Sequence, residues 1–579
     1  MRMAQVGVLL PRHALELRWR LGVNAFQRYL CEMLSHAGVP YILLEGTEAL
    51  SAEAYDIVIA AYADETPEDA ERLWAFAEAG GTIIAYGGLA SFRRRFGCLR
   101  GAPAAVGYAD VGAWNAKDGP LRFLEADPWT PGPAGAVPLD ASGRLTRESP
   151  DGEAAGPACL SFRIGAGVLH RWAVDVCATI VGLQQGTMPV LTDGWPAPDD
   201  TAAVDDGLLK AEDNAELHWE WDRRFTETGS PYFPSPYADL WRELCVAQLI
   251  GAALAKGLTL PFLGQWPDGV DAVALVSHDS DLNVPESAWT TLDLLEETGI
   301  RSCWCMIEPG FGPDVYERVE RDGHELAFHY NALPKDGGEW SRDAFRRQLE
   351  DFKATAGNAR IVSNKNHYTR FEGWGELWRW CEEGGVEVDQ TRGPSKRGNV
   401  GMTFGTCHPY FPIAWHDERN RLYDVLQIGF LTQDLDIGTW ADRSVVAPLL
   451  ERVRRVEGVA HFLFHQYHLQ YRPEARDALR YVAAEAKRRG FAFWTSREIN
   501  DWERARRRVK IVGVDEEGRP LLASGALPDG AVVWVPEPNP APGEALTVRY
   551  GAACRKAAAA AGTAGSAGSA GSAGGRRQS

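Results

Sequence analysis

The stretch Val273-Ala-Leu-Val-Ser-His-Asp-Ser-Asp281 is an apolar run that changes abruptly into a histidine and two acidic residues. Residues 273–276 have the character of a short buried strand, and the polar residues begin where such a strand would end. Asp279 and Asp281 are two positions apart, so in extended chain both carboxylates point to the same side. Two carboxylates that close need a bound cation or a shared proton. The stretch therefore predicts a buried strand that ends in a charged functional site.

Three later stretches repeat this pattern, in which a short apolar run is followed by a histidine: Glu325-Leu-Ala-Phe-His329, Arg360-Ile-Val-Ser-Asn-Lys-Asn-His367 and Val459-Ala-His-Phe-Leu-Phe-His465. If these runs are parallel strands of one barrel or open sheet, their carboxyl ends gather on a single face, which is where α/β folds place active sites. We therefore expect that face to hold five residues: Asp279, Asp281, His329, His367 and His465.

Length and composition limit the class of protein. A chain of 579 residues is too long for one compact core, so we expect two or three domains. The contents of hydrophobic residues (45%) and charged residues (24%) are those of a globular protein. A net charge of -19 argues against nucleic acid or an anionic membrane as partner, because such binding needs clustered Lys and Arg. No apolar stretch approaches the length of a membrane span.

The compartment is predicted from the N-terminus and the cysteines. The apolar residues 6–10 are followed at once by Pro11 and charged residues, a run too short for the core of a signal peptide. Ten cysteines are dispersed without the spacing of a disulfide framework. We interpret Cys303 and Cys305 as small buried hydrophobic residues rather than metal ligands. The sequence predicts a cytoplasmic protein.

The first part of the chain alternates strands with helices, which predicts a doubly wound parallel sheet. Residues 126–158 are rich in Pro, Gly and Ala and predict a surface insertion. Residues 185–237 have little periodicity, which is typical of a binding loop. The expected strands are residues 5–10, 41–45, 55–61 and 82–86, and the expected helices are residues 24–37, 67–79 and 238–256.

From residue 272 to about residue 500 the alternation resumes in about seven βα units, which favours a barrel over an open sheet. The expected strands include residues 301–307, 325–328, 360–363 and 458–465, and the helices include residues 342–356, 445–456 and 474–488. Residues 509–552 alternate in the manner of a small antiparallel β-module. Residues 556–579, with their Ala-Gly-Ser repeats, predict a disordered tail.

Two stretches in the first 262 residues, Asp56-Ile-Val-Ile-Ala and Phe76-Ala-Glu-Ala-Gly-Gly-Thr-Ile-Ile-Ala, resemble the class I glutamine amidotransferase-like fold, which is a flavodoxin-like doubly wound sheet. In amidase members a cysteine lies on a tight turn between a strand and a helix. Tyr86-Gly87-Gly88-Leu89 has no cysteine, and Cys98 does not follow a strand. The resemblance therefore implies a domain without amidase activity, serving as a scaffold or a wall beside the substrate.

The histidine-bearing stretches resemble the polysaccharide deacetylase (NodB-homology) superfamily over about residues 270–500. The first motif is closest to the H-D-x-D variant, and Gly323-His324-Glu325 matches the G-H-E that precedes the metal histidine of the family. The resemblance implies a distorted (β/α)7 barrel and a divalent metal, usually Zn²⁺. It makes Asp279 the general base, Asp281 and His329 metal ligands, and His465 the general acid.

One position departs from the pattern of the family. A second histidine usually follows the first by four residues, but that position is Leu333. Some H-D-x-D relatives supply this ligand from an N-H-Y-like element, which Asn366-His367-Tyr368 matches. The resemblance therefore implies His367 as the third ligand. Such a metal keeps an open position, lowers the pKa of water and polarises an amide carbonyl.

Further residues carry weaker signals. Arg370 is close to His367 in sequence and is expected to orient Asp279 or to stabilise an oxyanion, with a structural arginine as the alternative. His408 lies in a loop and either faces substrate or is a structural histidine. The 21 tryptophans suit sugar stacking as well as core packing, and four are candidates for sugar subsites: Trp289, Trp374, Trp415 and Trp440.

We therefore expect a metal-dependent hydrolase that removes an N-acetyl or related acyl group from an amino sugar or glycan, with a carbohydrate as its partner. A glycoside hydrolase is one alternative, because two carboxylates suffice for it and no metal is needed. A glycan-binding protein without activity is the other, and Leu333 supports it. Self-association into a homo-oligomer stays open.

Overall fold

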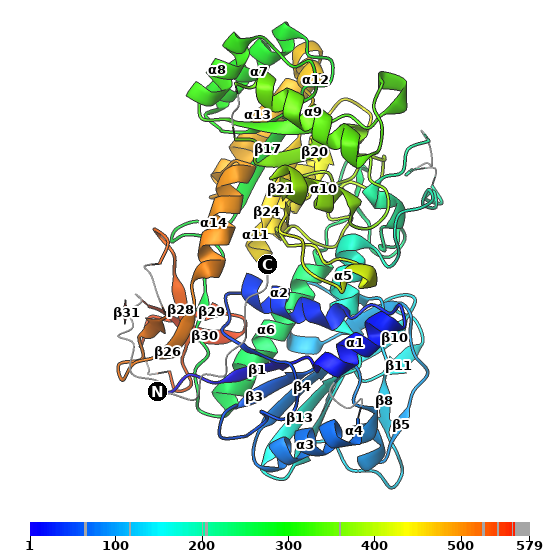
Figure 1. The fold of residues 1–579 in the computed structure, drawn as a ribbon, viewed down its shortest axis with the longest axis vertical. Coiled ribbons are helices and arrows are strands. Elements are labelled where there is room, and N and C mark those ends of the chain that lie inside the picture. The colour runs from blue at the N-terminus through cyan, green and yellow to red at the C-terminus, as the bar shows by residue number, and fades with distance from the viewer. Residues whose placement is uncertain are drawn as a thin grey trace, which may run out of the picture.

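The computed structural model describes residues 1–579 except 63–65, 115–116, 200, 203–206, 358–359, 524–526, 541–542, 558–559 and 562–579. Most of the tail predicted to be disordered lies outside the described residues, and residues 556–557 belong to strand β30 (Ala552–Ala557). Two α/β regions lie end to end along the long axis, and helix α14 (Ser496–Arg508) runs between them (Figure 1).

The N-terminal sheet has five parallel strands in the order β2-β1-β3-β4-β13, and β12 and β9 extend one edge in antiparallel pairing. Ile57 and Ile59 of β3 enter one hydrophobic cluster, whereas Val58 and Ala60 enter another, so both faces of the sheet are buried. This is the doubly wound arrangement that the alternation predicts. The strands are β1 (Val6–Leu9), β2 (Ile42–Leu44), β3 (Ile57–Ala60), β4 (Thr82–Tyr86), β9 (Asp140–Ser142), β12 (Cys159–Ile164) and β13 (Gly167–Trp172).

Helices cover both faces of this sheet. Residues of α2 (Tyr29–His36), α5 (Val176–Gln185) and α6 (Tyr237–Ala255) belong to the cluster that continues into the rest of the molecule. Residues of α3 (Pro67–Glu78) and α4 (Ala90–Arg95) belong to the cluster on the other face. Helix α1 (Arg12–Arg20), which follows Pro11, is an element that the sequence pattern did not predict.

Short antiparallel strands form the segment predicted as a surface insertion and the residues that precede it. Strand β10 pairs with β6 in a four-stranded antiparallel sheet, and β8 pairs with β5. The strands are β5 (Cys98–Arg100), β6 (Gly107–Asp110), β7 (Leu121–Phe123), β8 (Trp129–Pro131), β10 (Arg144–Arg147) and β11 (Ala154–Gly156).

The second α/β region is built on a curled sheet in which every strand pair is parallel, in the order β22-β21-β20-β19-β18-β17-β24-β23, with β25 paired to β17. Among the described residues no strand pairing joins β22 to β23, so the barrel is open there. The strands are β17 (Val273–Asp279), β18 (Cys303–Met306), β19 (Glu325–Tyr330), β20 (Ser363–Asn366), β21 (Val388–Asp389), β22 (Leu426–Gln427), β23 (Thr432–Gln433), β24 (Val459–Leu463) and β25 (Ala492–Phe493).

Helices alternate with these strands, as the βα pattern predicts. They are α7 (Pro285–Thr298), α8 (Pro313–Arg321), α9 (Arg342–Thr355), α10 (Glu376–Gly384), α11 (Val446–Val456), α12 (Gln466–Tyr471) and α13 (Pro473–Arg488). None of the described helices combines the length and the apolar character needed to span a bilayer.

A small β-region lies beside the junction of the two α/β regions. Strand β28 (Val533–Pro536) pairs on one side with β30 and on the other side with β16 (Phe262–Leu263), which comes from the segment that connects the α/β regions. Strand β30 pairs in turn with β29 (Thr547–Arg549). A second sheet joins β26 (Ile511–Val514), β27 (Pro520–Leu522) and β31 (Ala560–Ala561). The C-terminal strands are thus tied to the middle of the chain.

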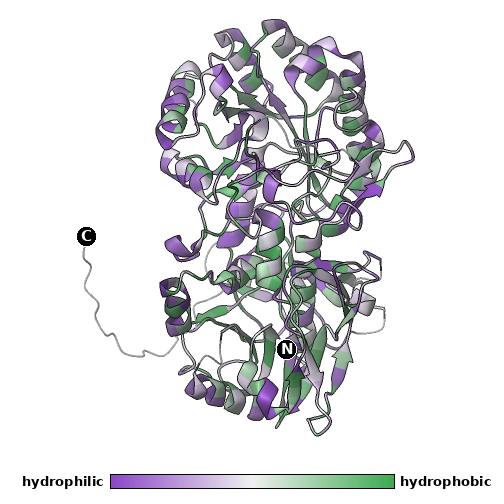
Figure 2. Cartoon of the chain, turned by 90° about the vertical axis from the view of Figure 1, so that its right-hand side faces the viewer, coloured by the Kyte–Doolittle hydropathy of each residue, from purple (hydrophilic) through white to green (hydrophobic). Residues whose placement is uncertain are grey.

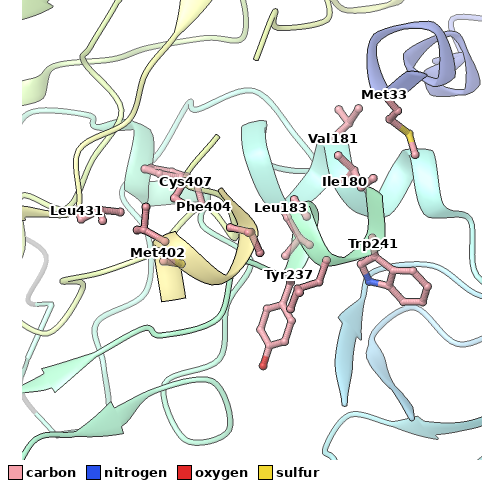
Figure 3. Packing of buried hydrophobic residues seen from close by; sticks show 14 of the residues in the cluster. Met33, Ile180, Val181, Leu183, Tyr237, Trp241, Met402, Phe404, Cys407 and Leu431 are labelled. Carbon is pink, nitrogen blue, oxygen red and sulfur yellow. The ribbon is translucent and has the colours of Figure 1, made fainter. Parts of the chain in front are cut away.

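One hydrophobic cluster runs through all of these regions. Leu183 of α5 lies beside Phe404 from a loop of the barrel (Figure 3). The same cluster contains Met33, Ile180 and Trp241 of the N-terminal region and Met402 and Cys407 of the barrel loops. The strands of both sheets are largely apolar, and the outer helices turn hydrophilic faces outward (Figure 2).

Candidate active site

The five residues expected on one face lie at the carboxyl ends of neighbouring strands. Asp279 ends β17 and Asp281 follows it. His329 lies near the end of β19, His367 directly follows β20, and His465 lies two residues beyond β24. Parallel pairing places β17 between β18 and β24, so residues distant in sequence meet at this edge. The gathering expected from the sequence is what the structure contains.

Asp281, His329 and His367 point one atom each at a common centre. Asp281 Oδ1 lies 3.3 Å from His329 Nε2 and 3.3 Å from His367 Nδ1, and the two ring nitrogens are 3.3 Å apart. Asp281 has a φ of 37°, which an aspartate tolerates better than most residues, and this turn directs its side chain toward the histidines. The pKa of Asp281 is held well below its usual value, because the charge of His465 and contacts with the two histidines outweigh the effect of burial.

A second partner fixes the orientation of His329, and a carboxylate lies near the outer nitrogen of His367. His329 Nδ1 lies 2.8 Å from the carbonyl oxygen of Lys365, and since a carbonyl only accepts, Nδ1 carries the proton and Nε2 presents its lone pair to the centre. His367 Nε2 lies 3.7 Å from Asp336 Oδ2 on the side away from the centre. Such outer partners hold metal-binding histidines in place.

These three side chains fit a divalent cation. Asp281 Oδ1 is buried and has no hydrogen-bond partner. Three distances of 3.3 Å make a near-equilateral triangle whose centre lies about 1.9 Å (3.3 Å divided by √3) from each atom, close to the ~2.0–2.2 Å of Zn–N and Zn–O bonds. Two imidazole nitrogens and one carboxylate oxygen are a donor set that Zn²⁺ and similar ions accept.

Asp279 lies beside this centre and is paired with a buried lysine. Lys365 Nζ lies 3.1 Å from Asp279 Oδ1 and donates to Ser277 Oγ at 2.5 Å. Burial alone would raise the pKa of Asp279, but the Lys365 ammonium and His329 lower it below its usual value. Asp279 Oδ2 faces His329 Nε2 at 3.8 Å. Asp279 is therefore an ionised carboxylate next to the centre, able to accept a proton.

His465 lies on the other side and is held by Asp434, which follows β23. The backbone N–H of His465 donates to Asp434 Oδ1 at 2.8 Å, and its Nδ1 contacts Asp434 Oδ2. Burial opposes protonation of this imidazole, but the charge of Asp434 and then that of Asp281 raise its pKa to about 10. His465 Nε2 lies 3.7 Å from Asp281 Oδ2, and the indole of Trp440 stacks on the ring. His465 is therefore a protonated acid near the centre.

Arg370 does not have the expected position. Its Nε donates to Glu372 Oε1 at 2.8 Å, and its Nη1 contacts the carbonyl oxygen of Ala332. The cation that pairs with Asp279 is Lys365. The role predicted for Arg370 in orienting Asp279 is therefore wrong, because sequence distance from His367 did not predict where the side chain points.

His408 is also absent from this site. Its Nε2 lies 2.6 Å from the carbonyl oxygen of Val456, and its ring packs edge-on against His36 of the N-terminal region. Cys407 next to it accepts a hydrogen bond from Val459, the first residue of β24, whereas His465 lies beyond the other end of that strand. The prediction that His408 contacts the substrate of this site is therefore wrong.

Of the four tryptophans considered for sugar stacking, only Trp440 contacts a residue of the site. Trp374 is buried, donates to the carbonyl oxygen of Ile413, and packs against Trp415 and Phe26. Trp289 lies near the guanidinium of Arg318 on the outer helices. Tyr368 and Leu282, which adjoin His367 and Asp281 in sequence, are 44% and 64% exposed and offer apolar surface there.

Sequence reasoning missed Lys365 and Asp434. Lys365 is fully buried inside a polar stretch, and the only available signal was a lysine within a run that ends in a site histidine. Asp434 follows the two-residue strand β23, as Asp279 ends β17. An acidic residue at the end of a further short strand was the signal that could have identified it.

No protein-family description and no curated protein sequence matches this chain. Among solved structures it is similar to a protein from Mycobacterium smegmatis assigned as a polysaccharide deacetylase (18% identity, 42% of this chain and 93% of that chain, TM-score 0.31). A second protein, from Bordetella bronchiseptica, is assigned as a polysaccharide deacetylase involved in O-antigen biosynthesis (19% identity, 34% of this chain and 72% of that chain, TM-score 0.24). A β-galactosidase from Rahnella sp. R3 reaches 16% identity over 30% of this chain and 28% of that chain (TM-score 0.24). Similarities this weak carry no conclusion about activity.

Proposed function

We propose that this chain is a metal-dependent hydrolase of the polysaccharide deacetylase type, which removes an N-acetyl or related acyl group from an amino sugar or glycan. The observation that supports it most is the convergence of Asp281, His329 and His367 at 3.3 Å between an ionised Asp279 and a protonated His465. An amide hydrolase needs this combination of a cation site, a base and an acid.

Asp281, His329 and His367 would hold the ion, for which Zn²⁺ is our first candidate because the donors are two imidazoles and one carboxylate. When bound, a divalent ion polarises the amide carbonyl and makes water a better nucleophile near neutral pH. His367 takes the place of the histidine that the family pattern puts at Leu333, a side chain that is buried and apolar here. With leucine instead of histidine at position 333, the site would still have three metal-binding side chains.

Asp279 would accept the proton of the attacking water. The Lys365 ammonium keeps it ionised and fixes Oδ1, so that Oδ2 is the oxygen directed toward the centre. His465 would donate its Nε2 proton to the nitrogen of the leaving amine, because Asp434 holds Nδ1 and keeps the ring protonated. The C–N bond of the amide breaks, acetate is released, and the amine leaves with the proton of His465.

The substrate class follows from the rim and from the charge. Tyr368 and Trp440 provide aromatic surface near His367 and His465, which suits sugar rings. A chain of net charge -19 favours a neutral or cationic glycan. We propose a cytoplasmic location, because the ten cysteines are dispersed without the spacing of a disulfide framework.

We propose no amidase role for the N-terminal region. Leu89 occupies the turn between β4 and α4 with a φ of 61°, so the position that would expose a nucleophile carries an apolar side chain. We propose instead that the N-terminal region serves as a scaffold or as a wall beside the substrate.

A glycoside hydrolase is disfavoured by the charges of the two carboxyl groups. Such enzymes need one carboxylic acid that stays protonated. The pKa values of both Asp279 and Asp281 are lowered, so neither is suited to that role.

The test is release of acetate from N-acetylglucosamine oligomers by protein loaded with zinc or cobalt. We expect turnover by the wild type and a loss of about 10²- to 10⁴-fold in kcat for Asp279→Asn and for His465→Asn, with Glu48→Gln, an exposed residue of the N-terminal region, as control. Zinc binding without acetate release from any acetylated sugar would instead support the binding protein without activity.

A further inference from the structure

A loop of the barrel, residues 394–399 between β21 and β22, holds the aromatic ring that lies against the proposed general acid. The indole N–H of Trp440 donates to the carbonyl oxygen of Ser395 at 2.8 Å. The same indole lies nearly parallel to the imidazole of His465, with 6.2 Å between the ring centroids and 11° between the ring planes. The position of this loop therefore sets the position of the ring beside His465.

The same loop also holds the strand end that carries the carboxylate partner of the acid. Gln433, the last residue of β23, donates its side-chain amide to the carbonyl oxygen of Pro394 at 3.0 Å. The next residue, Asp434, accepts from the backbone N–H of His465 at 2.8 Å and contacts its Nδ1. Two successive carbonyl groups of one loop thus fix two neighbours of His465.

The partner of this loop comes from the N-terminal region. Glu212 lies in the short helix Ala211–Asn214 and is 6% exposed. Its carboxylate accepts from the backbone N–H of Ser395 at 2.9 Å, from the hydroxyl group of Ser395, and from the side-chain amide of Asn399 at 2.8 Å. Hydrogen bonds to a carboxylate are among the stronger ones in proteins. One buried side chain therefore holds both ends of the turn from residue 395 to residue 399.

Two further contacts attach the same N-terminal segment to the rim of the barrel. Asp213 Oδ1 pairs with Lys396 Nζ at 2.5 Å, and both side chains are largely buried. The carbonyl oxygen of Leu209 accepts at 2.9 Å from the backbone N–H of Phe371, four residues after His367. The segment therefore lies beside the site and supports its loops, although the five residues of the site all come from the barrel.

We propose that Glu212 is a positioning residue for the general acid His465, acting through residues 394–399 on Trp440 and on Asp434. The inference rests on the proposed function, because the position of His465 matters only if this residue transfers a proton. Proton transfer needs the acid within hydrogen-bond reach of the leaving nitrogen, and a displacement of about 1 Å can cost about 10²-fold in rate. The N-terminal region would then take part in catalysis without contacting the substrate.

The first measurement is the kinetics of acetate release by zinc-loaded full-length protein. Glu212→Ala is expected to lower kcat about tenfold and to change KM less than about twofold. Glu212→Gln keeps an acceptor oxygen for Ser395 and is expected to retain more of kcat. Trp440→Phe keeps a ring but loses the donor to Ser395, so Glu212→Ala should add little to its loss of kcat in the double variant.

The matched control is Glu216→Ala in the same segment. Glu216 accepts from the backbone N–H of Thr187 at 3.2 Å, a contact within the N-terminal region. We expect its kcat and KM to equal those of the wild type. Loss of a contact that supports only the N-terminal region would affect this variant and Glu212→Ala alike.

The second measurement is hydrogen–deuterium exchange, which does not depend on activity. Residues 432–441 are expected to exchange faster in Glu212→Ala than in the wild type or in Glu216→Ala, because the loop that holds them loses its attachment. Should Glu212→Ala fail to fold, Glu212→Gln carries both measurements, with the same direction of change.

Three results would overturn the inference alone: unchanged exchange of residues 432–441 in the Glu212 variants, an unchanged kcat in those variants, or fully additive losses in the double variant with Trp440→Phe. A wild type that releases no acetate would contradict the proposed function itself, and the positioning of an acid would fall with it. Faster exchange combined with a normal kcat would show a structural contact that catalysis does not use.

Discussion

Lys365 carries the positive charge that keeps Asp279 ionised. Both side chains are almost fully buried, and the ammonium lies 3.1 Å from the carboxylate. A buried ion pair of this kind is costly to break, because removal of one partner leaves the other charge without compensation. The function of Asp279 and the stability of the barrel therefore depend on the same contact.

Lys365→Met is expected to lower the free energy of unfolding by about 3–5 kcal/mol and to lower kcat by about 10²-fold or more, since Asp279 would then be protonated more easily. Urea denaturation and acetate release measure the two effects. The double variant Asp279→Asn/Lys365→Met is expected to regain part of the stability and none of the activity. Equal stability of Lys365→Met and the wild type would contradict the pairing.

Asp434 is expected to set the alkaline limit of activity. Its carboxylate raises the pKa of His465, and the acid form of His465 is lost as the pH rises through that pKa. Asp434→Asn removes the charge, so the pKa of His465 falls and the alkaline limb of the kcat–pH profile moves to lower pH. Profiles measured from pH 6 to pH 10 with the same substrate decide this, and an unchanged limb would mean that His465 is not the acid.

At this scale the sequence predicted which residues would gather but not what holds them. Asp279, Asp281, His329, His367 and His465 each stand at the end of a recognisable run, and strand geometry brings them together. Lys365 lies 86 residues from Asp279, and Asp434 lies 31 residues from His465, so their pairing depends on the order of strands in the sheet. Arg370 was assigned to the site because it is close to His367 in sequence, but closeness in sequence does not determine where a side chain points.

Strand β20 shows what hydrophobic patterning misses at the scale of elements. Residues 360–363, with the apolar Ile361 and Val362 at their centre, were expected to form it, but the strand is Ser363–Asn366. Ser363 donates to Glu325, Asn364 donates to Asp389, and Lys365 pairs with Asp279, so each of these polar side chains has a partner inside the barrel, although Asn364 Oδ1 has none. A buried strand held by polar contacts has no apolar periodicity to detect.

Amphipathic helices were easier to predict, because their pattern extends over several turns. Residues 342–356 and 474–488 were expected, and α9 (Arg342–Thr355) and α13 (Pro473–Arg488) agree within one residue at each end. Helix α1 was missed because its sequence, Arg-His-Ala-Leu-Glu-Leu-Arg-Trp-Arg, is dominated by charged and polar residues.

The carboxyl group of Asp175, which caps helix α5, makes the stability of the N-terminal region depend on pH. Asp175 caps this helix by accepting from Ala178 N at 3.0 Å, and burial followed by the charge of Glu125 raises its pKa to about 7. In the unfolded chain its pKa is about 3.9. The stability contributed by the protonated acid is therefore fully present below about pH 4 and is lost as the pH rises through about 7.

Asp175→Asn keeps a capping side chain and does not titrate. We expect the variant to exceed the wild type in melting temperature at pH 8 and to lose that advantage at pH 4. Scanning calorimetry at the two pH values measures the difference. A variant less stable than the wild type at pH 8 would show that the ionised form of Asp175 is the stabilising one.

At the scale of the whole molecule the two α/β regions share one core and one buried ion cluster. Arg507 of α14 contacts Glu32 of α2, and Glu32 also accepts from the backbone of Phe411 in the barrel. Glu32 and Arg507 are buried where the regions meet. We therefore expect the regions to unfold together, which is unusual for a chain of this length.

Glu32→Ala is expected to lower the free energy of unfolding by about 3 kcal/mol, because among the described residues Arg507 would keep only Glu503 as a carboxylate partner. Glu48→Ala removes half of an exposed pair with Arg72 and is expected to cost less than about 1 kcal/mol. Calorimetry should show one transition for the wild type and for Glu48→Ala. Two well-separated transitions in the wild type would contradict a shared core.

The arrangement of the regions could be predicted only in outline. Alternating strands and helices indicated two α/β regions, and residues 509–552 indicated a β-module. That β28 would pair with β16, a strand 271 residues earlier, has no local signal in Phe262-Leu263. Contacts between regions depend on pairing of residues far apart in the chain, and local sequence patterns carry no information about such pairing.

The central claim is that Asp281, His329 and His367 bind a catalytic divalent ion, and elemental mass spectrometry of protein purified without chelator tests it most directly. We predict about one zinc or similar ion per chain in the wild type and in His416→Ala, and its loss in Asp281→Asn, His329→Ala and His367→Ala. Retention in His367→Ala alone would remove that residue from the ligand set. An absence of metal from the wild type, even after zinc, cobalt or manganese is added back, would contradict the account.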